Sequence, residues 1–279
     1  MRQKSYDNSP SLYLIPTPVG NMEDITLRAV NTLKMVDLLL CEDTRITSEL
    51  LHHLGIKKKL IHSDDHTEDS LKEMVLCKLQ EGLNIGLVTD RGTPIISDPG
   101  YRIVEYISKH GYNVISLPGP TAFVPALTMS GIHPSPFLFY GFLNSKTSKR
   151  EKELESLKKL TFTIIFYEAP HRIHDMLTSL LKIFGNRNIA LCREISKRYE
   201  EAIRGTVEEV LQIADSLKGE IVVVVEGNQV QEDFSSMTIL EHIALYLEDG
   251  MTEKEVIKKV AVERGIPKSI VYKEYHTEK

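Results

Sequence analysis

The sequence predicts an α/β fold in which a mostly parallel sheet carries helices on both faces. Short apolar runs alternate with segments whose apolar residues recur at helical spacing. Several of the runs end in loops rich in proline and glycine, which is typical of connections from a strand to a helix. The chain has 279 residues, enough for one large domain or two of ordinary size.

The first part of the chain contains five apolar runs with the length and flanks of buried strands. They cover residues 11–15, 37–42, 60–62, 84–89 and 113–117. Helical patterns follow the first four runs and end near Leu33, Gly55, Gln80 and Lys109. Asp24 is a candidate N-cap for the first of these helices.

A second set of elements begins near residue 121. The predicted strands cover residues 137–143, 161–167, 188–192, 200–204 and 221–225, with helices at residues 172–184 and 207–216. Residues 229–236 are polar and are typical of a linker. The remaining pattern is helical only, and residues 252–275 resemble a helix-turn-helix around Gly265-Ile266-Pro267. We therefore predict two α/β domains, residues 11–120 and 121–228, and a small helical extension, residues 236–279.

Composition narrows the classes of function. The net charge of −5 gives no global positive field for nucleic acid, so an RNA partner would need a local basic patch. Three widely spaced cysteines argue against a disulfide framework and against a CxxC metal site, and a reducing cytoplasm fits them. No apolar run approaches the length that spans a bilayer, and the polar first ten residues do not form a secretory signal. We expect a cytoplasmic protein with no membrane partner.

Three loops share one position and one composition. Residues 16–21, 90–100 and 118–122 each leave the carboxyl end of a predicted strand and are rich in proline and glycine. In open α/β sheets that edge is where ligands bind. Phosphate cradles need backbone N–H donors, usually with a lysine, whereas these loops contain prolines and no lysine. They predict a cleft that binds its ligand by shape, carbonyls and hydroxyls.

A resemblance to a known family covers residues 11–227 in order. It rests on Pro16-Thr17-Pro18-Val19-Gly20-Asn21, Glu42-Asp43-Thr44-Arg45, Asp90-x-Gly92-Thr93-Pro94, Ser97-Asp98-Pro99-Gly100-Tyr101, Pro118-Gly119-Pro120-Thr121-Ala122, Phe166-Tyr167-Glu168-Ala169-Pro170-His171-Arg172, Arg193-Glu194-x-x-Lys197 and Gly219-Glu220. The chain resembles the bacterial 16S rRNA cytidine 2′-O-methyltransferases of the tetrapyrrole-methylase superfamily. The helical C-terminus is also similar to theirs.

The resemblance implies two α/β domains of tetrapyrrole-methylase type, a homodimer, and S-adenosylmethionine (SAM) bound in the cleft between the domains. The substrate would be a cytidine of the 16S rRNA decoding centre, methylated on its ribose 2′-hydroxyl. By similarity, the cofactor-binding residues are Pro16, Pro18, Gly20, Asp90, Gly92, Thr93, Pro94, Ser97, Pro118, Gly119, Thr121, Ala122, Tyr167, Glu168, Ala169 and Glu220.

A ribose hydroxyl is a poor nucleophile, so a base near it should accelerate the transfer. The candidate catalytic residues are Glu42, Asp43, Arg45 and Asp24, with His66 and Glu168 as further candidate bases, and no single one stands out. Each has a structural alternative: Asp24 could cap its helix, and Thr44 could be a cap while Glu42 and Arg45 are merely paired. We expect no metal, because Asp64-Asp65-His66 has no second cluster at ligand spacing.

The chain departs from the family pattern at two places. Where the family usually has a small residue, this chain has Arg91, which we expect to point away from a sulfonium cofactor, toward an RNA phosphate. The usual aromatic-His-acid-His-Asn segment is Ser63-Asp64-Asp65-His66-Thr67 here, so only the acid and the second histidine are kept. Because the aromatic residue and the first histidine are missing here, an essential role for these two residues is in question.

Two rival functions stay open at this point. One is a tetrapyrrole methylase on the same fold, and the other is a ribosome-assembly factor that binds RNA without turnover. Two stretches carry an excess of basic residues that could contact RNA, residues 144–159 and the last 29 residues. Either could equally be a solvated helix face.

Overall fold

The computed structural model describes residues 3–5, 7–229, 234, 237–248 and 250–277. Residues 1–228 and residues 229–279 form two separate compact units. No helix in the described ranges is long and apolar enough to cross a membrane. Both sheets lie in the first unit, so the predicted domain boundary at residue 120 stays a prediction.

The first sheet has five parallel strands, as the apolar runs predict. They are β1 (Ser11–Leu14), β2 (Leu38–Cys41), β3 (Lys59–His62), β4 (Ile85–Leu87) and β5 (Asn113–Ser116), in the order β3-β2-β4-β1-β5. Because parallel neighbours need a crossover, each connection leaves at the carboxyl edge and returns through a helix or a long loop. The carboxyl ends of β1, β4 and β5 are adjacent, so the three proline- and glycine-rich loops meet.

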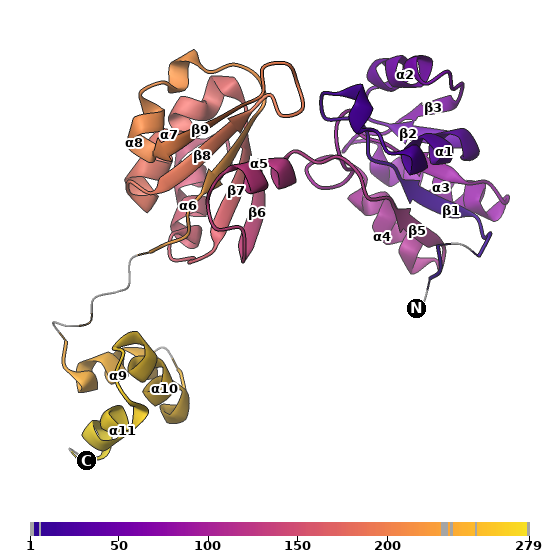
Figure 1. The fold of residues 1–279 in the computed structure, drawn as a ribbon. Coiled ribbons are helices and arrows are strands. Elements are labelled where there is room, and N and C mark those ends of the chain that lie inside the picture. Colours follow the sequence, from indigo (N-terminus) through magenta and orange to yellow (C-terminus); the bar gives the residue numbers. More distant parts are fainter. Residues whose placement is uncertain (1–2, 6, 230–233, 235–236, 249, 278–279) are drawn as a thin grey trace. The chain divides into compact units, whose positions relative to one another are not determined.

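Helices cover both faces of the first sheet (Figure 1). They are α1 (Leu27–Met35), α2 (Thr44–His53), α3 (Glu68–Gln80) and α4 (Tyr101–Lys109), and η1 (Met22–Asp24) precedes α1. Alternate strand residues point to opposite faces, so Leu39 packs with α1 and α2, and Leu40 packs with α3 and α4. This first α/β part therefore has two apolar layers around one sheet.

Whereas the first sheet is wholly parallel, the second sheet is mixed. Its strands are β6 (Phe137–Phe142), β7 (Thr163–Glu168), β8 (Asn188–Arg193), β9 (Glu201–Thr206) and β10 (Ile221–Val225), in the order β6-β7-β10-β8-β9. Only β6 and β7 are parallel, and the other pairs are antiparallel. The short connection from β8 to β9 has no room for a crossover helix, so these strands pair as a hairpin.

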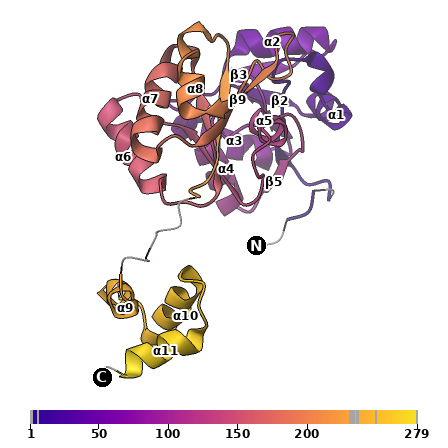
Figure 2. The same cartoon turned by 60° about the vertical axis from the view of Figure 1, so that its left-hand side comes forward.

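Three helices lie together on one face of the second sheet, and α5 (Phe123–Met129) lies on the other (Figures 1 and 2). The three are α6 (Thr147–Leu157), α7 (Ile173–Phe184) and α8 (Val207–Leu211), and short turns form η2 (Pro170–Arg172) and η3 (Ala214–Ser216). Helix α6 is the charged stretch that could contact RNA. Its Arg150 is only 2% exposed and donates to Ser179 Oγ at 3.0 Å, so this residue is part of the packing and is not a surface cation.

The second unit contains the helices α9 (Ile239–Glu248), α10 (Glu253–Glu263) and α11 (Lys268–Thr277). They bury a small core of their own, which includes Ile243, Val256 and Val271. The two helices predicted on either side of Gly265-Ile266-Pro267 are α10 and α11. Most of the predicted linker, and residue 236 where the extension was predicted to begin, lie outside the described residues.

Candidate functional site

The three loops at the carboxyl edge of the first sheet are bonded to one another. Thr17 and Gly92 exchange two backbone hydrogen bonds, of 2.9 and 3.1 Å, which join the loop after β1 to the loop after β4. The Thr93 hydroxyl donates to the Pro120 carbonyl oxygen at 2.8 Å, which joins the loop after β4 to the loop after β5. The loops thus form one continuous wall.

Close packing explains two residues of this wall. A Cβ on Gly119 would lie 2.5 Å from Pro16 Cβ and 2.7 Å from Pro16 Cγ, so only glycine lets these two loops meet. Gly92 has a φ of 83°, in the left-handed region that favours glycine, and the turn there brings its backbone to Thr17. Ile95 has a φ of 76°, which is strained for a β-branched residue, and such strain is common at functional sites.

The second α/β part contributes loops after β7, between β8 and β9, and before β10. Glu194 and Ser196, with φ values of 52° and 68°, form the tight start of the β8–β9 loop. Gly219 leaves room for the Glu194 side chain, and Gly20 of the first part leaves room for Lys197. The loops of the two parts are therefore in direct contact through Gly20 and Lys197.

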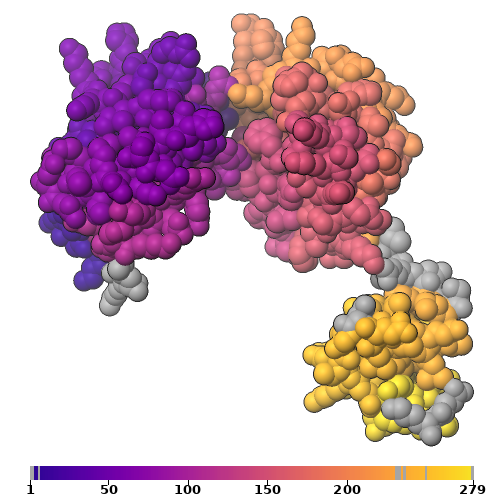
Figure 3. Space-filling view, turned by 180° about the vertical axis from the view of Figure 1, so that it is seen from behind, coloured from indigo at the N-terminus to yellow at the C-terminus, as the bar shows by residue number. Residues whose placement is uncertain are grey.

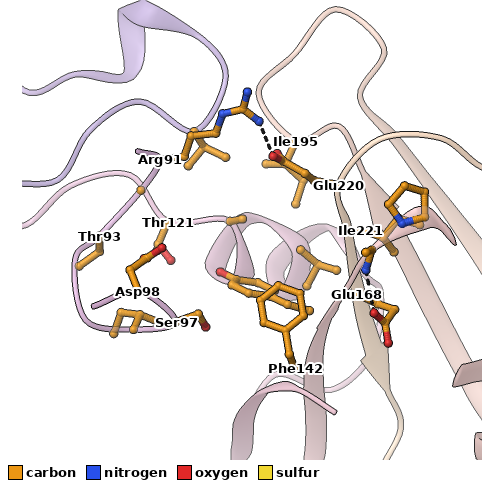
Figure 4. Close-up of a pocket in the computed structure, with 18 residues that line it drawn as sticks. Arg91, Thr93, Ser97, Asp98, Thr121, Phe142, Glu168, Ile195, Glu220 and Ile221 are labelled. Carbon is orange, nitrogen blue, oxygen red and sulfur yellow. Dashed lines mark hydrogen bonds and ion pairs between the residues drawn. The ribbon is translucent and has the colours of Figure 1, made fainter. Parts of the chain in front are cut away.

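These loops enclose a main cavity of about 270 Å³. In the space-filling view of Figure 3 a notch separates the two α/β parts, and Figure 4 shows the residues that line the cavity. Its lining is predominantly apolar and comes from both parts: Val19, Arg91, Gly92, Thr93, Ile96, Ser97, Asp98, Thr121, Ala122, Phe142, Tyr167, Glu168, Ala169, Pro170, Ile195, Glu220, Ile221 and Val222. Apolar walls with a few polar groups are typical of small-molecule sites.

Asp98 provides a carboxylate on the wall formed by the first part (Figure 4). Burial raises the pKa of Asp98 above its ordinary value, the Thr89 hydroxyl lowers it, and the nearby Asp90 carboxylate raises it further. Glu42 belongs to the same acidic group, because burial and the Asp90 and Asp98 charges raise its pKa as well. A cationic ligand in the cavity would relieve this accumulation of negative charge.

A chain of ion pairs crosses the mouth of the main cavity. Arg91 Nη1 pairs with Glu220 Oε1, Lys197 Nζ lies 3.0 Å from Glu220 Oε2, and Lys197 Nζ lies 2.9 Å from Glu194 Oε1. Arg91 lines the cavity and faces Glu220 of the second part (Figure 4), so the direction of its side chain relative to a bound cofactor stays a prediction. Its partner lies 129 residues away in sequence, which is why the sequence alone could not place it.

A second, more open cavity of about 560 Å³ adjoins the first and shares Val19, Thr121 and Ile195 with it. Its polar lining includes Asp24, whose carboxylate accepts a hydrogen bond from Ser196 Oγ across the two parts. Asp24 is not the N-cap of α1, because Thr26 is, with its side chain accepting from Ala29 N at 3.0 Å. Asp24 is thus free of that structural role.

The structure brings nine of the predicted cofactor-binding residues to the main cavity. These are Gly92, Thr93, Ser97, Thr121, Ala122, Tyr167, Glu168, Ala169 and Glu220. The other seven, Pro16, Pro18, Gly20, Asp90, Pro94, Pro118 and Gly119, do not line it. Of these, Gly119 lines the second cavity, and Pro16 and Gly20 pack the loops against each other. Asp90 instead accepts a hydrogen bond from Asp43 N at 3.0 Å.

Glu168 lines the cavity without offering its carboxylate, since its side chain is fully enclosed. Oε1 accepts from Ala169 N at 2.8 Å and lies 3.3 Å from Arg172 Nε, and burial raises the pKa of this carboxyl. On β7 the side chain of Glu168 falls on the same face as Ile164 and Phe166, toward α6 and α7. Its role as a candidate base therefore stays a prediction, and the enclosure of its side chain counts against it.

Several lining residues were not among the predicted cofactor-binding residues, namely Val19, Ile96, Asp98, Phe142, Pro170, Ile195, Ile221 and Val222. Of these, Val19, Ile96 and Asp98 lie in the two loops, residues 16–21 and 90–100, that were predicted to form the cleft. Asp98 was within reach of sequence reasoning, because it is a carboxylate in the loop after β4 that already supplied Ser97. The apolar residues were not, since a valine or isoleucine near a strand end looks the same whether it faces a cavity or the core.

The Glu42–Arg45 motif has structural roles in the described chain. Asp43 is the N-cap of α2, where the alternative had placed Thr44, and it accepts from Arg45 N at 2.8 Å. It also pairs with the Arg45 side chain at 2.6 Å, and this hydrogen bonding holds the pKa of Asp43 at about 2. Glu42 lines a small space with Ser63 and Thr89, apart from the main cavity. None of Glu42, Asp43 and Arg45 lines either of the two larger cavities.

The segment at residues 63–67 forms a turn. Asp64 accepts from His66 N at 3.0 Å and Thr67 N at 2.9 Å, and its carboxylate lies 3.1 Å from His62 Nε2. Hydrogen bonding to Thr67 holds the pKa of Asp64 at about 2. Across the ranges that the structure describes, no group of three or more His, Cys, Asp or Glu side chains is arranged to hold a metal ion.

Comparison with known proteins identifies the chain's family. The family model of the tetrapyrrole (corrin/porphyrin) methylases matches residues 11–211. The ribosomal RNA small subunit methyltransferase I of Bacillus subtilis (strain 168) is 46% identical over 286 residues, covering 99% of this chain and 98% of that protein. The protein of the same name from Escherichia coli O157:H7 is 40% identical, covering 98% of this chain and 97% of that protein.

A solved structure shows the same fold. The uroporphyrin-III C-methyltransferase of Thermus thermophilus, solved in complex with S-adenosylhomocysteine, aligns with a TM-score of 0.57 over 77% of this chain and 97% of that chain. Its identity of 19% supports the fold alone. These findings confirm the predicted α/β fold class, and with the relatives they confirm a methyltransferase that uses SAM. The chain therefore belongs to the ribosomal RNA small subunit methyltransferase I family of the tetrapyrrole methylases.

Proposed function

We propose that this protein transfers the methyl group of SAM to the ribose 2′-hydroxyl of a cytidine in the decoding centre of 16S rRNA. The observation that carries the proposal is identity of 46% and 40%, over almost the whole chain, to two proteins named ribosomal RNA small subunit methyltransferase I. The proposed substrate is the small ribosomal subunit. Since bacterial ribosomes are in the cytoplasm, the proposal places the enzyme there.

The main cavity fits SAM by the chemistry of its lining. Ile96, Ala122 and Val222 give apolar walls that suit an adenine ring, and Asp98 gives a carboxylate that suits a cationic or hydroxyl-bearing ligand. The hydroxyl of Thr93 is engaged by Pro120, so it fixes the wall instead of binding the ligand. When bound, SAM supplies a methyl group on a sulfonium that is already a good leaving group.

The chain's own residues mainly supply position. Holding two reactants in a productive geometry provides about 7–11 kcal/mol of a barrier. The shared walls Val19, Thr121 and Ile195 place the second cavity directly beside the main one, so we assign the second cavity to the acceptor nucleoside. Of the four predicted catalytic residues, Asp24 is the one that lines this cavity. We propose Asp24 as the group that accepts the hydroxyl proton, with Ser196 Oγ orienting its carboxylate.

A homodimer is also part of the proposal, on the family resemblance. Several large apolar side chains are exposed on the first unit, among them Leu27 at 84% and Tyr101 at 62%. Exposed apolar side chains of this size are common at interfaces when they are contiguous. Light scattering of the purified full-length protein tests the dimer: a mass near 31.7 kDa would contradict it.

The experiment that tests the activity uses labelled SAM and small ribosomal subunits from a strain that lacks the modification. We expect label on one cytidine ribose of 16S rRNA, located by nuclease mapping. The Asp24→Asn variant should bind SAM normally and transfer about 10²- to 10⁴-fold more slowly. SAM binding without transfer to the subunit would contradict the proposed substrate, and transfer to a tetrapyrrole would assign the chain to the other branch of the fold.

A further inference from the structure

The residues that form the ion pairs at the mouth of the main cavity differ in the number of charged partners that each one has. Glu220 has two cationic partners, with Arg91 on Oε1 and Lys197 on Oε2. Lys197 has a second carboxylate, Glu194 Oε1, at 2.9 Å. Among the residues that the structure describes, Arg91 has Glu220 as its one ion-pair partner. If Arg91 moved away, Glu220 and Lys197 would still be paired, so Arg91 is the replaceable member of the chain.

Little free energy holds Arg91 in place. Its side chain is 49% exposed and that of Glu220 is 60% exposed. Ion pairs at such exposure contribute about 0–1 kcal/mol, because water screens them and two long side chains must be ordered. An incoming anion therefore needs to bind Arg91 only slightly more favourably than Glu220 does in order to replace it.

The guanidinium keeps donors available for that anion. Within the described chain only Arg91 Nη1 donates to a partner, while a guanidinium has five N–H donors in a fixed fork. That fork matches the oxygens of a phosphate, which can accept two parallel hydrogen bonds.

The surrounding charges decide which anion is favoured. The interior of the main cavity carries Asp98, with Asp90 close by, so an anionic group of a ligand deep in the cavity would be repelled. Arg91 itself lies half exposed at the rim, where a macromolecule outside the cavity reaches it. Arg91 therefore offers a positive charge at the rim, on a chain whose net charge is −5.

We propose that Arg91 binds a backbone phosphate of the RNA substrate next to the target nucleotide, exchanging Glu220 for that phosphate. Glu220 then stays paired with Lys197, and in the absence of RNA it holds Arg91 at the rim. This inference rests on the proposed RNA substrate and assigns to it a contact that Lys197 does not make, since Lys197 is held by Glu194 and Glu220.

The test measures binding of full-length protein to unmodified small ribosomal subunits without SAM, over about 50 to 200 mM salt. Arg91→Ala should raise the Kd about 5- to 10-fold at the lower salt and reduce the slope of log K against log salt by about 0.7–0.9, as the loss of one phosphate contact predicts. Arg91→Lys should give an intermediate Kd, because it keeps the charge and loses the fork. The Kd for SAM, measured by calorimetry, should change less than about twofold.

Two further variants distinguish RNA binding by Arg91 from a purely structural role of its ion pair with Glu220. Glu220→Gln removes the competing carboxylate, so it should tighten RNA binding about 2- to 5-fold. Lys109→Ala removes one positive charge from an exposed ion pair with Glu105, in the last turn of α4 and away from the cavity, and it should leave RNA binding unchanged. Lys109 is the matched control for loss of charge.

Four results would overturn the inference. These are an unchanged salt slope in Arg91→Ala, equal weakening by Arg91→Ala and Glu220→Gln, loss of SAM affinity in Arg91→Ala, and no binding of wild-type protein to the subunits. Loss of SAM affinity would assign Arg91 to the cofactor's carboxylate instead. Because RNA binding is measured without SAM, a protein that shows the Arg91 effect but transfers no methyl group would reject the proposed activity and keep the inference.

Discussion

Asp98 is the residue at which we expect protonation to control cofactor binding. Its pKa is raised above the ordinary value of 3.8, first by burial and then by the Asp90 charge. A cationic ligand favours the deprotonated form, so ligand binding and loss of the proton support each other. The affinity for SAM should therefore fall as the pH is lowered through the raised pKa of Asp98.

Asp98→Asn should remove this pH dependence and weaken SAM binding at neutral pH by about 10-fold or more, the usual effect of losing a charged hydrogen-bond partner. Calorimetric titrations from neutral pH down through the acidic range would measure both effects. Glu105→Gln, an exposed carboxylate paired with Lys109, is the control and should behave as the wild type. An unchanged pH dependence in Asp98→Asn would show that another group titrates.

Glu168 lies in a motif that suggests a catalytic role, but its surroundings indicate a structural role. Its side chain is fully enclosed, and its raised pKa comes first from burial. Glu168→Gln keeps the shape and an acceptor for Ala169 N, so we expect at least about a tenth of wild-type methyl transfer. A raised carboxyl pKa makes its charged form unfavourable in the folded state, so stability from this group is lost as the pH rises through that pKa.

Thermal unfolding at several pH values measures the stability effect of Glu168→Gln, which should be smallest in acid, where both proteins have a neutral side chain. A loss of transfer beyond about 10²-fold with normal SAM binding would return Glu168 to the catalytic candidates. Asp24→Asn, in parallel, supplies the comparison with a carboxylate that does line a cavity.

At the scale of elements, the packing of the loop after β5 against the loop after β1 is the feature most sensitive to a small change. Gly119→Ala would place a Cβ 2.5 Å from the Cβ of the rigid Pro16 ring. We expect a loss of about 1–3 kcal/mol in the free energy of unfolding, because overpacking between backbone segments forces them apart. SAM affinity should fall as well, since both loops belong to the wall that Thr93 and Pro120 complete.

Urea unfolding and SAM calorimetry measure these two effects. Gly205→Ala on β9 is the comparison for a crowded glycine away from the wall: the nearest atom to its Cβ is Glu209 Oε2 at 2.7 Å, which accepts from Thr206 N in the capping box of α8. This variant should lose stability through the cap but keep its affinity for SAM. Equal losses of SAM affinity in both variants would mean that the contact with Pro16 has no special role.

The sequence located the strands of both sheets about equally well, but it predicted the strand directions only for the first sheet. Runs such as residues 37–42 and 84–89 became β2 and β4, because parallel strands buried on both faces give continuous apolar runs. The direction of β8, β9 and β10 was not predictable in this way, since the same apolar pattern serves parallel and antiparallel neighbours. The excess of basic residues at α6 was also misleading as a sign of an RNA-binding surface, because Arg150 in this helix is enclosed by its neighbours.

At the scale of the whole molecule, the cores divide the described chain at residue 228. The helices α9, α10 and α11 have their own apolar core, and the main cavity is lined only by residues of the first unit. A protein that ends at Asn228 should therefore fold cooperatively and bind SAM with a Kd within about twofold of the full chain. Circular dichroism and calorimetry measure both properties.

A loss of SAM binding in this truncated protein would show that the first unit needs residues 229–279. A full-length protein in which Val256→Asp disrupts the core of the helical unit is the companion variant, because it keeps the chain length and removes only the packing. Both variants should agree if the two units are independent.

The sequence by itself determined the fold class, the family, the three wall-forming loops and half of the residues that line the cavity. The fold class and the loops follow from periodicity and from glycine–proline loops, which are local properties of the chain, whereas the family and the cofactor-binding residues follow from motifs that resemble those of known methyltransferases. Only the tertiary structure decided which carboxylates face a cavity: it enclosed Glu168, used Asp43 to cap α2, and exposed Asp98 and Asp24. It alone paired Arg91 with Glu220, because the field around a charged group comes from residues that are distant in sequence and close in space.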